Sequence, residues 1–290
     1  MHLIDPEVAE KIERLELPFN QYGLDPYGID KGYLKRFFSF LGFVYNRWLT
    51  VDAYGIENVP DRGRAMVVGN HSGGVALDGG MIIASLMLDK AQPRLAQGMA
   101  EIFLNSTPFV STILSRVGQF TGLPEHAVRL LEDDRLLMVF PEGARGTAKL
   151  YPARNSLVRF GTGFIRLALQ TGTPIVPTAF IGGGEAIPTI ANLYRLGKLV
   201  GAPYVPVTPW VLPLPRPTTC QIYYGEPMTF EGDGSEEDSV IDSYVEEVKA
   251  RIGQLIEFGV ESRRRDDFSR PIPDGSDAVA SIPRADEVVA

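Results

Sequence analysis

A histidine and an aspartate, His71 and Asp78, lie in VVGNHSGGVALDGG (67–80), which joins an apolar run to a glycine-rich turn. A carboxylate that accepts a hydrogen bond from one imidazole nitrogen fixes the tautomer, so the other nitrogen can take a proton. A continuous helix would hold the two residues about 10 Å apart. Gly73-Gly74 can turn the chain, and a helix starting near Val75 would then place Asp78 in its first turn, facing His71. The spacing predicts a general base and the group that orients it.

A second polar motif, Phe140-Pro141-Glu142-Gly143-Ala144-Arg145-Gly146, follows another apolar run. The backbone N–H groups of Gly143 and its neighbours can cradle an anion or a developing oxyanion. Arg145 can pair with a phosphate, and Glu142 can either position a hydroxyl or hold Arg145. We predict that Glu142, Gly143 and Arg145 bind the substrate. The alternative is a purely structural turn.

Four further residues are candidates for the same site. Asn70 and Ser72 flank the histidine, and Arg154 and Arg159 can add positive charge at the mouth of the site, or can belong to a solvated face. A structural role is also an alternative for His71, because a lone histidine at a strand end is more often structural than catalytic. The three histidines are too far apart in the sequence for metal-ligand spacing, so no metal is expected.

The composition restricts the partners and the compartment. The chain has 290 residues, 44% of them hydrophobic, and a formal net charge of −8. It can therefore bury a large core, and it lacks the basic stripes that nucleic acids require, so no nucleic acid is expected as a partner. The single Cys220 excludes an internal disulfide, which favours a reducing compartment. The N-terminus lacks the apolar core of a signal peptide, so secretion is not expected.

Apolar runs alternate with helix-like segments in the middle of the chain. Residues 65–69 and 136–140 have the pattern of buried strands, and 155–171 that of an amphipathic helix. The alternation predicts an α/β fold with a mixed, mostly parallel sheet covered by helices. Functional groups in such sheets gather at the carboxyl edge of the strands. Because His71 and Glu142 each follow a strand, the two motifs are expected to meet at one edge.

An aromatic segment, residues 31–49, precedes this region. It carries four basic residues and no acidic ones, and as a helix it gathers large apolar side chains on one face. Aromatic groups at headgroup depth and cations near anionic lipid are typical of a helix in a membrane interface, which is our prediction. The alternative is a core-packing helix. The predicted face consists of Leu34, Phe37, Phe38, Leu41, Val44, Tyr45 and Trp48.

Two later segments complete the expected organisation. Residues 201–217 are apolar but rich in proline, which predicts an extended surface loop whose exposed side chains mark an interface, with a membrane as one candidate. The end of the chain is charged and has the composition of a disordered tail. We therefore expect an N-terminal lead with a membrane-interface helix (1–49), an α/β domain (50–260) and a disordered tail (261–290).

Three blocks in this order, NHSGGVALDG, VFPEGARG and PIVPTAFIG, resemble the glycerophospholipid acyltransferase family and its lysophosphatidic-acid-acyltransferase-like members. The resemblance extends over residues 50–230. Six residues separate His71 from Asp78, more than in the usual motif of the family, and such longer variants resemble the neutral-lipid acyltransferase branch. The family block that contributes an arginine to bind the acceptor phosphate corresponds to residues 118–123, which contain no arginine. The acceptor is therefore either phosphorylated or neutral.

The resemblance implies an acyltransferase with an α/β fold, peripheral or monotopic on the cytoplasmic side of a membrane with anionic lipid. It implies transfer of a fatty acyl group from acyl-CoA or acyl carrier protein, as co-substrate and without a bound cofactor, to a hydroxyl of lysophosphatidate, diacylglycerol or another alcohol. His71 would remove the hydroxyl proton, and Asp78 would stabilise the imidazolium. Two alternatives remain at this stage: a membrane-peripheral lipid-binding protein that keeps the fold without activity, and a hydrolase in which His71 activates water.

Overall fold

A seven-stranded sheet in the order β1-β9-β6-β2-β5-β3-β4 forms the centre of the protein. The computed structural model describes residues 4–100, 110–121, 124–199 and 201–275. Strand β2 pairs in parallel with both β5 and β6, whereas β9 runs antiparallel to β6. The sheet is thus mixed and mostly parallel, which confirms the predicted fold class. The strands are β1 (Val51–Tyr54), β2 (Ala65–Gly69), β3 (Ala96–Ala100), β4 (Phe120–Thr121), β5 (Leu136–Val139), β6 (Ile175–Ile181) and β9 (Cys220–Tyr224).

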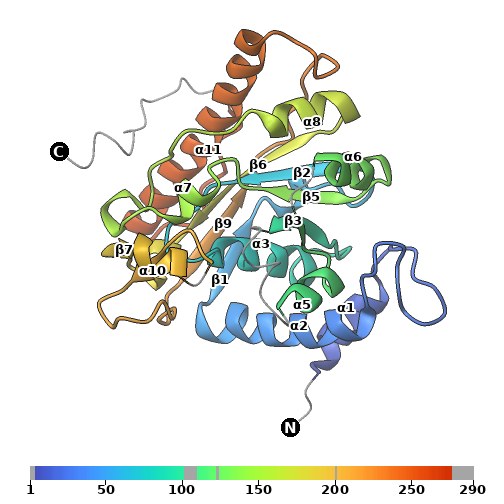
Figure 1. Cartoon of the computed structure of the whole chain (residues 1–290), viewed down its shortest axis with the longest axis horizontal. Helices are drawn as coiled ribbons and strands as arrows, with labels where there is room; N and C mark the ends of the chain where they lie inside the picture. The colour runs from blue at the N-terminus through green and yellow to red at the C-terminus, as the bar shows by residue number, and fades with distance from the viewer. Residues whose placement is uncertain (1–3, 101–109, 122–123, 200, 276–290) are drawn as a thin grey trace.

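Helices cover both faces of the sheet (Figure 1). Every residue of β2 is buried, and its side chains alternate: Ala65 and Val67 belong to one apolar cluster, Met66 and Val68 to the other. The strand is apolar throughout because helices lie on both sides of it. One face is covered by α1 (Pro6–Glu13), α2 (Lys31–Phe43), α3 (Leu77–Leu88) and α5 (Val110–Arg116), the other by α6 (Pro124–Glu132), α8 (Gly163–Thr171) and α11 (Asp238–Arg265).

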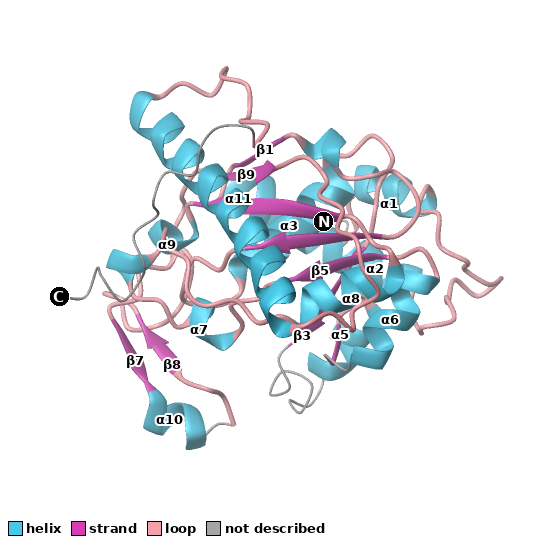
Figure 2. Ribbon diagram, turned by 90° about the horizontal axis from the view of Figure 1, so that it is seen from above, coloured by secondary structure: helices cyan, strands magenta, loops and turns pink. Residues whose placement is uncertain are grey.

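A small β-hairpin-like unit lies beside the main sheet (Figure 2). Strand β7 (Ala191–Leu193) leads into α10 (Tyr194–Leu199), and β8 (Val205–Val207) returns antiparallel to β7. The prediction of a loop over all of 201–217 is therefore wrong for β8. Pro206 is accommodated because β8 belongs to a two-stranded sheet, where a residue without an N–H group can occupy an edge. We call residues 186–218 the flap.

The face of α2 that was predicted to meet a membrane mostly packs into the protein. Leu34, Phe38 and Leu41 are buried in the cluster that also contains Val8 and Ile12 of α1. The core-packing alternative is thus right for this face, and residues 1–49 are not a separate lead. Periodicity identified the side that is buried, but it could not show whether that side meets the protein core or a membrane. It continues as a π-helical turn, Val44–Trp48.

The helix predicted over 155–171 begins only at Gly163. In the segment before Gly163, backbone N–H groups donate to residues outside the segment. The N–H of Val158 donates to the carboxylate of Glu142 at 2.9 Å, and the N–H of Gly161 donates to the carbonyl of Pro141 at 2.9 Å. These groups are therefore not available for intrahelical bonds, and the segment before Gly163 is not α-helical.

The disordered tail predicted from residue 261 is wrong up to residue 275. Helix α11 continues to Arg265, Ser262 is fully buried, and Ile272 packs against the core. Glu261 pairs with Arg264 and Arg265 in the last turn, where cations also favour the helix dipole. The charged composition of this segment predicted disorder. Its charged side chains instead form ion pairs within the last turn of α11, and these pairs stabilise the helix. Residues 276–290 lie outside the described residues.

Among the described residues, further short helices and 3₁₀ turns connect these elements: α7 (Ala144–Thr147), α9 (Gly183–Ala186), α10 (Tyr194–Leu199), Ile56–Asn58 and Tyr151–Ala153. None of the helices within the described ranges has the length and apolar character needed to cross a bilayer.

Candidate active site

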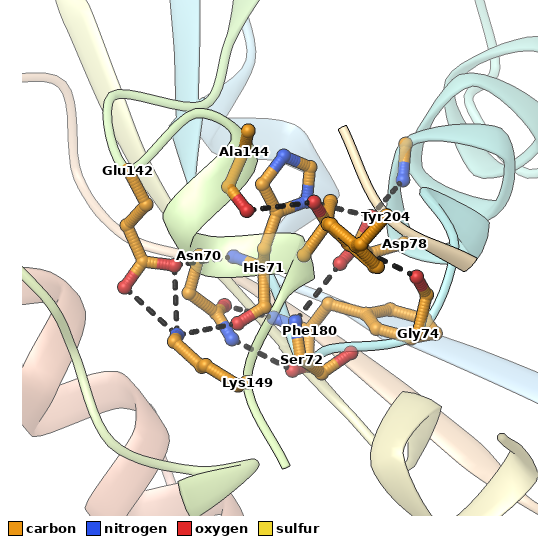
Figure 3. A network of polar contacts seen from close by, with 12 residues as sticks. Asn70, His71, Ser72, Gly74, Asp78, Glu142, Ala144, Lys149, Phe180 and Tyr204 are labelled. Atoms are coloured by element: carbon orange, nitrogen blue, oxygen red, sulfur yellow. Dashed lines mark hydrogen bonds and ion pairs between the residues drawn. The ribbon is translucent and has the colours of Figure 1, made fainter. Parts of the chain in front are cut away.

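His71 follows β2 directly, and Asp78 lies in the first turn of α3. Nδ1 of His71 lies 3.0 Å from Oδ1 of Asp78, so the contact expected from the sequence forms (Figure 3). Gly73 and Gly74 turn the chain with φ angles of 95° and 76°, which residues with a Cβ adopt at a cost. A Cβ on Gly73 would also lie 2.6 Å from the carbonyl oxygen of Lys149. The two glycines therefore make the long His-Asp spacing compatible with a direct hydrogen bond.

The carboxylate of Asp78 is fixed by two backbone groups as well as by the imidazole. Its Oδ2 accepts from the N–H of Ser72 at 3.0 Å, and its Oδ1 accepts from the N–H of Gly79 at 2.9 Å. The imidazole stacks on the ring of Phe140, with centroids 4.1 Å apart and planes at 14°. Because Asp78 engages Nδ1, Nε2 is the nitrogen that can take a proton from a substrate.

Glu142 joins the second motif to the backbone of His71. Its Oε2 accepts from the N–H of His71 at 3.0 Å, and Lys149 Nζ lies 2.8 and 2.7 Å from its two oxygens. Lys149 also donates to the carbonyl oxygen of His71 at 2.6 Å. Glu142 and Lys149 thus hold both polar groups of the His71 backbone, on the opposite side of His71 from Asp78 in the view of Figure 3.

The Glu142–Lys149 pair is almost completely withdrawn from water, with side-chain exposures of 0% and 1%. Burial lowers the pKa of the Lys149 ammonium, and the neighbouring Glu142 carboxylate opposes that shift. The sequence suggested Arg145 as a partner of Glu142, but the described ion pair of this carboxylate is with Lys149. Protein groups occupy both oxygens of Glu142, so we interpret its role here as positioning His71.

Among the other predicted residues, Asn70 has a clear structural contact: its amide exchanges two hydrogen bonds with the backbone of Phe180, which joins the end of β2 to β6. Ser72 is buried beside Asp78. The N–H of Gly143 donates to the carbonyl of Phe140 at 3.0 Å. That N–H group is therefore engaged within the turn.

The three arginines proposed for the site differ in their surroundings. Arg145 and Arg159 are exposed. Arg154 is half-buried, pairs with Glu185 at 2.7 Å and stacks on the ring of Tyr151. Its charge is partly compensated by that carboxylate.

Two residues of the site, Lys149 and Phe140, have roles that the sequence does not indicate. Lys149 lies seven positions after Glu142, outside the motif that ends at Gly146. Phe140 was included in an apolar run, but a run shows burial and not a ring stacked on His71. Both roles depend on the three-dimensional path of the chain after β5.

Replacing Gly146 by alanine is expected to destabilise the site. The new Cβ would lie 2.5 Å from Oε2 of Glu142 and 2.8 Å from Cβ of His71, and overpacking of this kind costs about 1–3 kcal/mol. Urea unfolding and the turnover rate would measure the effect. Gly163→Ala is the matched control, because nothing lies within 4 Å of its Cβ position. Equal behaviour of the two variants would show that the close packing around Gly146 does not matter.

Comparison with known proteins shows the family to which this chain belongs. A family model described as Acyltransferase matches residues 50–181, which include His71, Asp78 and Glu142. The chain is 31% identical over 255 residues to an uncharacterized protein of Mycobacterium tuberculosis, covering 84% of this chain and 71% of that protein. The chain belongs to the acyltransferase family. This confirms the family inferred from the three sequence blocks.

A solved structure and a second curated protein are also similar to this chain. The crystal structure of the 1-acyl-sn-glycerophosphate (LPA) acyltransferase PlsC from Thermotoga maritima matches with a TM-score of 0.54 and 20% identity, over 81% of each chain. This match supports the fold. A Bos taurus protein described as a "DGAT1/2-independent enzyme synthesizing storage lipids" is 25% identical over 130 residues, covering 45% of this chain and 38% of that protein.

Proposed function

We propose that this acyltransferase moves a fatty acyl group from acyl-CoA or acyl carrier protein to a hydroxyl group of a glycerolipid. The observation that carries the proposal is the 3.0 Å contact between His71 and Asp78, which lies within the region matched by the acyltransferase family model. A histidine oriented through Nδ1 presents Nε2 as a base, which is what an attacking hydroxyl needs.

In the proposed mechanism, Nε2 of His71 takes the proton of the acceptor hydroxyl while the hydroxyl oxygen attacks the thioester carbon. The carbon–sulfur bond then breaks, and the imidazolium returns its proton to the leaving thiolate. Asp78 stabilises the imidazolium in between. The products are the ester and the free thiol. The acyl group is never attached to the protein, and His71 ends the reaction in its starting protonation state.

The acceptor is proposed to be either lysophosphatidate or a neutral glycerolipid such as diacylglycerol. The description of the Thermotoga maritima protein supports a phosphorylated acceptor, and that of the Bos taurus protein supports storage lipids. The exposed Arg145 and Arg159 would favour a phosphate if the acceptor carries one.

An acceptor screen tests this function. Purified protein would be given acyl-CoA or acyl carrier protein thioester together with lysophosphatidate, diacylglycerol or a simple alcohol. We expect thiol release that depends on the acceptor, with an ester as product. Free fatty acid formed equally without an acceptor would identify a hydrolase instead. Absence of turnover with every pair, combined with retained lipid binding, would identify a lipid-binding protein.

A further inference from the structure

The link between His71 and Asp78 depends on support from outside itself. It contains six residues, among them Gly73 and Gly74, and glycine has more conformational freedom than any other residue. Helix α3 starts after Ala76, whose side chain provides no cap. Both glycines are nevertheless buried. The conformation of the turn therefore depends on the segments that surround it.

Three side chains of the flap surround Gly74, and all three are buried. A Cβ on Gly74 would lie 2.8 Å from Cγ2 of Ile187 and 3.4 Å from Oγ1 of Thr189. The hydroxyl of Tyr204 donates to the carbonyl oxygen of Gly74 at 3.3 Å (Figure 3). Tyr204 thus bonds the turn directly, at a glycine whose φ of 76° reverses the direction of the chain.

The flap is also anchored to the segment that carries Lys149. The side-chain amide of Asn192 donates to the carbonyl of Ala148 at 2.6 Å. The carbonyl of Thr189 accepts from the N–H of Tyr151 at 2.8 Å. The flap therefore contacts both supports of the catalytic histidine, namely this segment, whose lysine holds the histidine carbonyl, and the glycine turn.

Tyr204 itself is held firmly in the flap. It is buried and directly precedes β8, which pairs with β7. Gly197 in α10 allows the two backbones to approach, because a Cβ at this position would lie 2.5 Å from Cα of Tyr204. The ring of Tyr194 meets that of Tyr204 with centroids 6.1 Å apart and planes at 61°. A side chain fixed in this way can hold the turn in one conformation.

We propose that Tyr204 is a positioning residue for the His71–Asp78 pair. Its hydroxyl holds the glycine turn in the conformation that brings Oδ1 of Asp78 to 3.0 Å from Nδ1 of His71. Without this hydrogen bond the turn samples other conformations, and the imidazole has the productive orientation for a smaller fraction of the time. The inference deepens the proposed function, on which it rests for the role of His71 as the base.

Steady-state kinetics of Tyr204→Phe tests this role. The ring and its packing stay and only the hydroxyl is lost, so kcat for acceptor-dependent thiol release should fall about tenfold. KM for the thioester and for the acceptor should not change, because Tyr204 orients the base and not the substrates. Tyr194→Phe is the matched control, since it removes a hydroxyl from the same flap at an exposed residue. Equal kcat of the two variants would overturn the positioning role.

A double-mutant cycle measures whether Tyr204 acts through the histidine–aspartate pair. In an Asp78→Asn background the orienting carboxylate is already lost. Adding Tyr204→Phe should therefore change kcat far less than it does in the wild type, because the two residues act on the same geometry. An equal loss of kcat in both backgrounds would mean that Tyr204 affects turnover by another route, and would overturn the proposal.

Proton NMR of the full chain reports on the pair without turnover. The Nδ1–H of His71, bonded to the carboxylate of Asp78, should give a far-downfield resonance in the wild type and in Tyr194→Phe, and His71→Ala should remove it. Tyr204→Phe should broaden this resonance or abolish it, and an unchanged resonance would overturn the inference. Loss of the resonance in Tyr204→Phe, together with a wild type that transfers no acyl group to any acceptor, would reject the proposed function alone.

Discussion

Alanine in place of His71 is expected to lower kcat for thioester-dependent esterification by about 10²- to 10⁴-fold, the usual contribution of a general base. The imidazole is held between Asp78 and the ring of Phe140, so no other side chain takes over its position. Acceptor-dependent thiol release by the purified variant measures the effect.

The fold of this variant should be retained. The backbone N–H and carbonyl of residue 71 keep their bonds to Glu142 and Lys149, and Asp78 keeps its two backbone donors. Circular dichroism and urea unfolding would verify this. His126→Ala is the matched control, since His126 is exposed on α6 and should leave turnover unchanged. Turnover by the His71→Ala variant close to that of the wild type would show that His71 is not the base.

The second large effect is expected on stability. Lys149→Met should lower the free energy of unfolding by about 3–5 kcal/mol, because it leaves the buried carboxylate of Glu142 without its counter-ion. Both side chains are inaccessible to water, so solvent cannot compensate for the lost cation. The variant should also lower kcat, since the ammonium holds the carbonyl of His71. Urea unfolding and turnover below the unfolding midpoint would measure the two effects.

A double-mutant cycle measures how much of the lost stability comes from the interaction between Lys149 and Glu142. Removing both charges with Lys149→Met/Glu142→Gln should be less destabilising than the sum of the two single changes, because the partners interact directly. Arg264→Met is the surface control: Arg264 is exposed, its partner Glu261 is only half-buried, and surface pairs contribute about 0–1 kcal/mol. If Lys149→Met destabilises no more than Arg264→Met, the buried pair does not stabilise the site.

The positions of the two site motifs could be predicted from the sequence because they depend on local pattern. Continuous apolar runs indicate buried parallel strands, and polar residues directly after such runs must lie at the same sheet edge. His71 and Glu142 therefore meet in the structure. Gly73-Gly74 similarly indicated the turn that brings Asp78 to His71.

The partner of Glu142 could not be predicted in this way. Arg145, Lys149, Arg154 and Arg159 all follow this residue closely in the sequence. The backbone path after β5 decides which cation reaches the carboxylate, and the structure brings Lys149 there. The same path takes the N–H of Val158 to Glu142 and delays the start of α8 to Gly163. Long-range hydrogen bonds of this kind leave no periodic signal.

The sequence by itself determined the α/β architecture, the family and the identity of the histidine–aspartate pair, because each rests on local periodicity or on a short motif. Only the tertiary structure decided that the apolar face of α2 packs into the core, which cation neutralises Glu142 and which apolar side chains remain exposed around Trp48 and the flap. The physical reason is that burial and ion pairing depend on which segments pack together. Segments distant in sequence make those contacts, and their own patterns are compatible with more than one partner.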